Sequence, residues 1–82
     1  MPIPLNGFLQ GDLIGLVIFA DEEETVQSLA RKLQRAAAVR VLPRLGQRVQ
    51  VLLRGRALDP ALTVAVAGFE PQDRFDVVFE AP

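Results

Sequence analysis

The 82-residue sequence contains no histidine, cysteine, tyrosine or tryptophan. Without imidazole or thiolate groups, the chain lacks the usual ligands of zinc, haem and iron–sulfur clusters, and it lacks the usual general base near neutral pH. No glycine-rich phosphate loop is present either. The side-chain hydroxyls, on Thr25, Ser28 and Thr63, have no base to activate them for nucleophilic catalysis. We therefore predict no catalytic, cofactor-binding or metal site on this chain, and no independent enzyme.

One acidic run, Asp21 to Glu24, offers carboxylates to a hard cation. Carboxylates bind hard cations when their oxygens converge in a loop, but the EF-hand spacing with its turn glycine is missing here. The run precedes a predicted helix, where the positive end of the helix dipole favours acidic residues. We interpret it mainly as part of the helix start.

Size and composition indicate one folded domain over residues 1–82, because 50% of the residues are hydrophobic and 23% are charged. The longest apolar run, Leu13 to Ala20, is far shorter than the ~20 residues that span a bilayer. The start of the sequence has no basic segment followed by an apolar one, so we expect no secretory signal and a cytoplasmic protein.

The first half of the sequence predicts a hairpin followed by a helix. Two apolar segments, Ile3 to Leu9 and Leu13 to Phe19, flank a polar turn and are typical of paired strands. From Thr25 to about Ala38 the apolar residues recur with helical spacing. Thr25, or Asp21 together with Glu24 as a capping box, is expected to cap this helix.

The second half predicts strands again. Pro43 excludes helix, so residues 39–45 should form a connecting arm. Alternation over residues 49–54 places Val51 and Leu53 on one face and Leu52 on the other. A short strand at residues 56–58, a helical turn at 63–67 capped by Thr63 and closed by a glycine, and a last strand from residue 74 complete an α+β architecture.

This order of elements resembles the ubiquitin-like β-grasp fold. The shared features are the helix opened by Thr25-Val26, the strand Val51-Leu52-Leu53 with Arg54-Gly55-Arg56 after it, and the closing Phe75-Asp76-Val77-Val78. More closely, the chain resembles the small ubiquitin-like (gamma or B) subunit of bacterial multicomponent diiron monooxygenases of the toluene and aromatic-hydrocarbon type. That likeness is carried by Ile3-Pro4-Leu5-Asn6-Gly7-Phe8, by residues 40–46 (RVLPRLG), by Gly68-Phe69-Glu70-Pro71 and by residues 75–80 (FDVVFE).

The resemblance implies a non-catalytic structural subunit of a soluble NADH-dependent hydroxylase that acts on aromatic hydrocarbons or alkenes. Its partners would be a large diiron subunit and a second related hydroxylase subunit, with a reductase, a ferredoxin and an effector protein in the wider system. The diiron cofactor is expected on the large subunit, because such sites need Glu-x-x-His pairs on facing helices and this chain has no histidine. Nucleic acid and membrane partners are not expected.

Other β-grasp proteins fit less well. Ubiquitin and sulfur carriers need a free Gly-Gly terminus, whereas this sequence ends in Glu80-Ala81-Pro82, so conjugation is not expected without processing. Plant-type ferredoxins hold their cluster with cysteines, which are absent. The alternative reading is a ubiquitin-like accessory protein of a type VII secretion system, an interaction module to which residues 43–46 and 68–73 are also similar.

The net charge is only −1, but the charges are unevenly distributed. Eight cations follow one another without an intervening acid: Arg31, Lys32, Arg35, Arg40, Arg44, Arg48, Arg54 and Arg56. They form either a solvated face neutralised by the acids on both flanks or an electrostatic docking surface for an acidic subunit, for which arginine is well suited. We select Arg40 and Arg44 as candidate contacts. Nucleic-acid binding lacks support, since no aromatic residues alternate with these cations.

Four apolar residues are candidate partner contacts. Leu52 and Val78 lie opposite the core positions of their strands, where they are either scattered surface residues or a recognition patch matching that of ubiquitin. Pro4 and Leu5 belong to a rigid apolar arm that we expect to pack against another subunit. The five phenylalanines are expected in the core, Phe69, Phe75 and Phe79 above all.

Overall fold

A computed structural model describes residues 2–42 and 47–80. Its elements run in the order β1 (Ile3–Leu9), β2 (Leu16–Ala20), α1 (Val26–Ala36), β3 (Val49–Leu53), β4 (Arg56–Ala57), α2 (Val64–Ala67) and β5 (Arg74–Phe79). The strands form one five-stranded mixed sheet in the order β2-β1-β5-β3-β4. The first and last strands, β1 and β5, lie side by side and parallel at its centre, and the other pairs are antiparallel.

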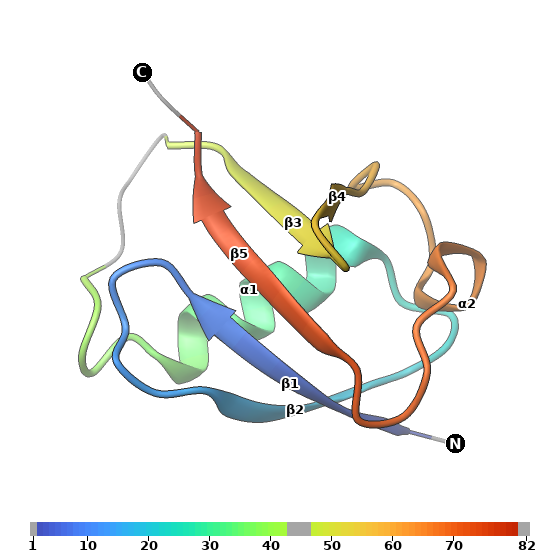
Figure 1. The fold of residues 1–82 in the computed structure, drawn as a ribbon, viewed down its shortest axis with the longest axis horizontal. Coiled ribbons are helices and arrows are strands. Elements are labelled where there is room, and N and C mark those ends of the chain that lie inside the picture. Colours follow the sequence, from blue (N-terminus) through green and yellow to red (C-terminus); the bar gives the residue numbers. More distant parts are fainter. Residues whose placement is uncertain (1, 43–46, 81–82) are drawn as a thin grey trace.

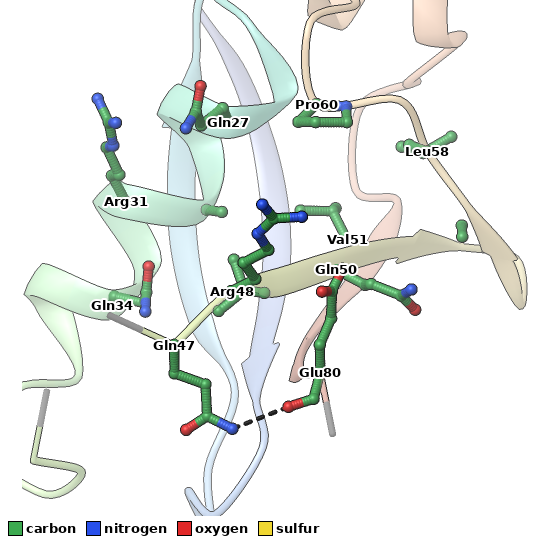
Figure 2. A pocket seen from close by; sticks show the side chains of 13 residues that line it. Gln27, Arg31, Gln34, Gln47, Arg48, Gln50, Val51, Leu58, Pro60 and Glu80 are labelled. Atoms are coloured by element: carbon green, nitrogen blue, oxygen red, sulfur yellow. Dashed lines mark hydrogen bonds between the residues drawn. The ribbon is translucent and has the colours of Figure 1, made fainter. Parts of the chain in front are cut away.

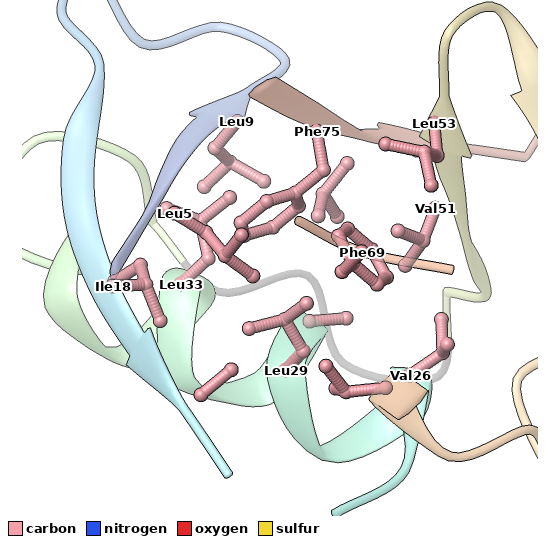
Figure 3. Packing of buried hydrophobic residues seen from close by; sticks show 14 of the residues in the cluster. Leu5, Leu9, Ile18, Val26, Leu29, Leu33, Val51, Leu53, Phe69 and Phe75 are labelled. Atoms are coloured by element: carbon pink, nitrogen blue, oxygen red, sulfur yellow. The ribbon is translucent and has the colours of Figure 1, made fainter. Parts of the chain in front are cut away.

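Helix α1 crosses one face of this sheet (Figure 1). The helix buries Val26, Leu29, Ala30 and Leu33, which are the positions that the helical spacing predicted. These side chains pack against the inner face of the strands and against Phe69 and Phe75 (Figure 3). A sheet covered on one face by a helix is the α+β β-grasp arrangement that the sequence predicted.

Both helix starts use the predicted caps. The Thr25 hydroxyl accepts a hydrogen bond from the Ser28 N–H at 3.1 Å, and the Thr63 hydroxyl accepts one from the Val66 N–H at 3.2 Å. The alternative cap also exists in part, because the Glu24 carboxylate accepts a bond from the Asp21 N–H at 2.7 Å. All three hydroxyl-bearing residues of the chain therefore lie in or beside helix starts and are accounted for by local structure.

The inner face of the sheet follows the predicted alternation. Val51 and Leu53 of β3 are buried, as are Phe75 and Val77 of β5, while Phe79 is partly buried. Phe69 and Phe75 meet edge to face with their ring centroids 6.1 Å apart. Both rings belong to the core cluster, as the sequence predicted.

The prediction differs from the structure in the hairpin. Strand β2 begins at Leu16 and not at Leu13, and the Leu13 side chain is 98% exposed. The turn is longer than expected because Gly11 adopts a left-handed φ of 92° and the Asp12 carboxylate accepts a bond from the Leu13 N–H, which draws the chain away from the ladder. The apolar character of residues 13–15 did not distinguish turn from strand.

The expectation that all five phenylalanines lie in the core is wrong for two of them: the Phe19 side chain is 60% exposed, and Phe8 is only partly buried and lies outside the core cluster, beneath the Arg74 guanidinium. Phe19 pairs with Pro4 across the β1–β2 ladder, one position from Ala20 and Ile18, which face the core. Because successive residues of a strand face opposite sides, Phe19 must lie on the outer face of the sheet.

Candidate protein-interaction surfaces

The outer face of the sheet, which α1 leaves uncovered, contains Leu52 and Val78. The ladder pairs Leu52 with Asp76 and Gln50 with Val78, so the two aliphatic side chains are diagonal neighbours on this face. Both are partly exposed, and Leu52 points away from Val51 as predicted. The sequence thus located an apolar spot on the outer face. That this spot contacts a partner stays a prediction.

A charged centre divides this outer face. The Arg74 guanidinium bonds the Asp76 carboxylate at 3.0 Å and lies 4.0 Å from the centroid of the Phe8 ring. Beyond Phe8 the outer face continues over β2, where Val17 and Phe19 are exposed. The face is therefore two apolar areas on either side of an ion pair.

Pro4 and Leu5 do not form a separate arm. They belong to β1, where Pro4 pairs with Phe19 and Leu5 with Ile18. Leu5 is fully buried among the core residues, so the prediction that it contacts another subunit is wrong. The reason is strand alternation, which turns Leu5 inward and places the partly exposed Pro4 on the outer face. A partner contact of Pro4 stays a prediction.

Arg40 is held by an ion pair within the chain. Its Nε and Nη2 atoms donate to the two carboxylate oxygens of Asp12 at 2.8 and 2.9 Å. This bidentate bond lowers the pKa of Asp12 and raises the pKa of Arg40. The Asp12 side chain is 2% exposed and that of Arg40 36%, so the pair fastens the β1–β2 turn to the segment after α1. The second candidate cation, Arg44, lies outside the described residues.

Two further cations of the basic stretch are also paired. Lys32 bonds Glu24 at 2.7 Å and the Phe19 carbonyl at 2.9 Å, and Arg54 bonds Asp73 at 2.8 Å. For these residues the solvated-face interpretation, with charges neutralised by flanking acids, describes the structure.

In the acidic run preceding α1, the Glu24 carboxylate is engaged within the chain in the same way. Burial would raise the pKa of Glu24, but hydrogen bonds from Lys32, Ser28 and the Asp21 N–H outweigh it and lower that pKa. Within residues 2–42 and 47–80, no three acidic side chains gather where a metal ion could bind.

Four arginines remain without a hydrogen bond or ion pair to any other described side chain: Arg31, Arg35, Arg48 and Arg56. All four are exposed. Among the described residues of the basic stretch, these four carry a charge that no described acid pairs with.

Two of these arginines, Arg31 and Arg48, border a groove of about 630 Å³ between α1 and β3 (Figure 2). We call it the α1–β3 groove. Its apolar lining comprises Ala30, Val49, Val51, Ala57, Leu58 and Pro60, and its polar lining comprises Gln27, Arg31, Gln34, Gln47, Arg48, Gln50 and Glu80. At one end of the groove, the Gln47 side-chain amide donates to the Glu80 carbonyl at 2.9 Å.

The sequence reasoning missed this groove because its two walls are far apart in the chain. One signal in the sequence was available: Arg31 and Arg48 have no acidic residue nearby in the sequence, and glutamines lie close to both. Only the fold brings them to one place.

No helix in the described part of the chain is long and apolar enough to cross a membrane.

Comparison with protein families gives one match over most of the chain. A family model described as toluene-4-monooxygenase system protein B (TmoB) matches residues 2–79. A search of functionally characterised protein sequences found no match.

Comparison with solved structures gives close likenesses in fold. A chain of a toluene 4-monooxygenase HD complex with the inhibitor 4-bromobenzoate is 24% identical, with a TM-score of 0.88, and the match covers 98% of this chain and 100% of that one. A ubiquitin from Caldiarchaeum subterraneum is 18% identical, with a TM-score of 0.74, and the match covers 100% and 98% of the two chains. The ubiquitin-like domain of Plasmodium falciparum Dsk2 is 15% identical, with a TM-score of 0.72 and coverage of 98% and 100%. The fold is thus that of the ubiquitin-like proteins.

Proposed function

The chain belongs to the family of toluene-4-monooxygenase system protein B, and we propose that it is a non-catalytic structural subunit of the hydroxylase component of a monooxygenase acting on aromatic hydrocarbons or alkenes. The observation that carries the proposal is the family match over residues 2–79. The likeness to a chain of the toluene 4-monooxygenase complex, over the full length of that chain, supports it.

The chemistry of the side chains supports a role without catalysis. Carboxylate-bridged diiron sites draw glutamates and histidines from several facing helices. This chain has no histidine, and α1 is the one helix of more than a single turn among its described residues. Asp12 and Glu24, two carboxyl groups whose pKa is lowered, are engaged in ion pairs that hold a turn and a helix start. The iron therefore belongs on another subunit.

The partners follow from this assignment. The proposed hydroxylase contains a large diiron subunit and a second related subunit, to which this chain binds as a small interaction module. Electrons from NADH reach the diiron subunit through a reductase and a ferredoxin, and a separate effector protein completes the system, which we place in the cytoplasm. The present chain contributes surfaces to this assembly and no reacting group.

Co-expression tests the proposal. When the chain is produced together with the large and second hydroxylase subunits from the same organism, all three should elute as one complex from a sizing column, and iron should follow the large subunit. Failure of the chain to join that complex, or the presence of a secretion ATPase gene beside it in place of a diiron subunit, would contradict the proposal.

A further inference from the structure

The edge of β3 beside the α1–β3 groove carries backbone groups that bond no other described residue. The Arg48 carbonyl accepts a bond from the Glu80 N–H at 2.9 Å on the β5 side, and the Val51 carbonyl accepts one from the Leu58 N–H at 2.9 Å on the opposite side. Alternate residues of a strand direct their backbone groups to opposite edges. Val49 therefore directs its N–H and C=O away from β5, toward the groove.

No strand covers β3 at this point in the described part of the chain. The short strand β4 pairs only with Leu52 and Leu53, at the far end of β3. An uncovered strand edge is a ready template for an additional strand, because the added backbone supplies the missing donors and acceptors. An added strand also needs an apolar surface for its inward side chains, and the groove next to Val49 provides one.

The charges around the groove select the chemistry of the occupant. Arg31 on α1 and Arg48, the residue before β3, line the groove, and neither bonds another described side chain. Glu80 is the one acid in the lining, so the fixed charge is positive by one unit. The side-chain amides of four glutamines in the same lining both donate and accept hydrogen bonds. An extended segment with carboxylates beside small apolar residues is complementary to this surface.

We propose that the α1–β3 groove binds an extended acidic segment of a hydroxylase partner subunit, which adds as a short strand to the edge of β3 at Val49 and pairs its carboxylates with Arg31 and Arg48. This inference rests on the proposed function for the identity of the partner. It assigns the docking to a surface different from the outer sheet face that contains Leu52 and Val78.

Charge reversal tests the ionic part of the proposal. Arg31→Glu with Arg48→Glu should weaken binding of the chain to the co-purified hydroxylase subunits by at least about tenfold, measured as the dissociation constant at fixed ionic strength. Both side chains are exposed and neither is paired with another described side chain, so the melting temperature of the isolated variant should stay close to that of the wild type. The matched control, Arg35→Glu with Arg56→Glu, makes the same change in net charge outside the groove lining and should bind as the wild type does.

Hydrogen exchange tests the strand addition. The Val49 amide of the isolated chain should exchange rapidly, and assembly with the hydroxylase subunits should slow its exchange more than about tenfold. The Gln50 amide is the internal control, because Gln50 pairs with Val78 of β5 and should be protected in both states.

The outcomes are distinct. A wild-type chain that fails to join the hydroxylase subunits overturns the proposed function and this inference with it. A wild-type complex in which the groove variant binds normally, or in which the Val49 amide stays unprotected, overturns only the inference. Protection of Val49 in the isolated chain together with a dimer in sedimentation would identify a second copy of the chain as the occupant and would also overturn it.

Discussion

Substitution of Leu52 by aspartate tests the outer face of the sheet with a magnitude that the structure sets. Leu52 is only partly buried, so losing its aliphatic contacts should cost about 1 kcal/mol of unfolding free energy. The new carboxylate would lie directly opposite Asp76, and like charges across a ladder add about 0.2–1 kcal/mol. The total, about 1–2 kcal/mol, leaves the chain folded, because a chain of 82 residues is typically stable by about 4–12 kcal/mol.

Two further variants separate the contributions. Leu52→Lys loses the same aliphatic contacts but places a cation opposite Asp76, so it should be more stable than Leu52→Asp by about 1 kcal/mol. Val51→Asp should unfold the chain outright, because Val51 is 4% exposed and a charge there has no partner in a small apolar core.

Urea unfolding followed by far-ultraviolet circular dichroism is the assay, since the chain has no tryptophan or tyrosine to report by fluorescence. A folded Val51→Asp beside an unfolded Leu52→Asp would refute the assignment of inner and outer faces. The same variants test the contact prediction. If Leu52 and Val78 meet a partner, Leu52→Asp should also lose binding by several kcal/mol, and normal assembly with the hydroxylase would show that this patch is not an interface.

Three other expectations can be measured on the isolated chain. Gly7→Ala would place a Cβ 2.8 Å from Cζ of Phe75 and 2.9 Å from a methyl carbon of Leu33, so it should lower the unfolding free energy by about 1–3 kcal/mol. Leu33→Val in the same chain should recover part of that loss. A double variant whose loss of unfolding free energy equals the sum of the two single losses would contradict this packing argument. The bond to Arg40 lowers the pKa of Asp12, so the stability that this ion pair contributes is complete above the ordinary aspartate pKa of about 3.9 and is lost as the pH falls through the lowered pKa. Arg40→Gln, which lacks the ion pair, should therefore lose less unfolding free energy than the wild type below about pH 4, as measured by urea unfolding at a series of pH values. Equal losses in the two proteins would refute the assignment. Iron analysis of the purified chain should find no stoichiometric, chelator-resistant metal, and a retained iron would overturn the reasoning from its ligands.

The fold could be predicted from local patterns because most of them agreed with one another. The 3.6-residue spacing of Val26, Leu29 and Leu33 identified the buried side of α1, and the alternation around Val51 identified the inner face of β3. The caps were readable because a hydroxyl directly before an apolar helix has few other uses. The errors fell where composition was uniform, as at Leu13, which is as apolar as a strand residue but lies in a turn.

The candidate surfaces were less predictable because they depend on pairings between distant residues. Nothing in the local sequence shows that Arg40 meets Asp12 while Arg31 meets none of the described acids, and this difference decides which cations we propose as partner contacts. To predict that the Leu5 side chain faces the core and the Pro4 side chain faces outward, one needs the register of β1 against β2. The open strand edge at Val49 could not be predicted either, because it depends on β4 being only two residues long.

The parallel pairing of β1 with β5 has a consequence for the order of events during synthesis. At the centre of the sheet, Asn6 pairs with Arg74 and Leu9 with Val77. Strand β1 therefore cannot form this pairing until β5 has been synthesised. Bringing these two strands together lowers the conformational entropy of the chain before any contact between them has formed to offset the loss. Topologies with such non-local contacts fold slowly. Until Phe75 and Val77 leave the ribosome, the apolar face of α1 has only the hairpin to cover it. Folding of this chain is therefore a late event, and any partner that recognises its sheet or its groove must bind after translation has reached the final strand.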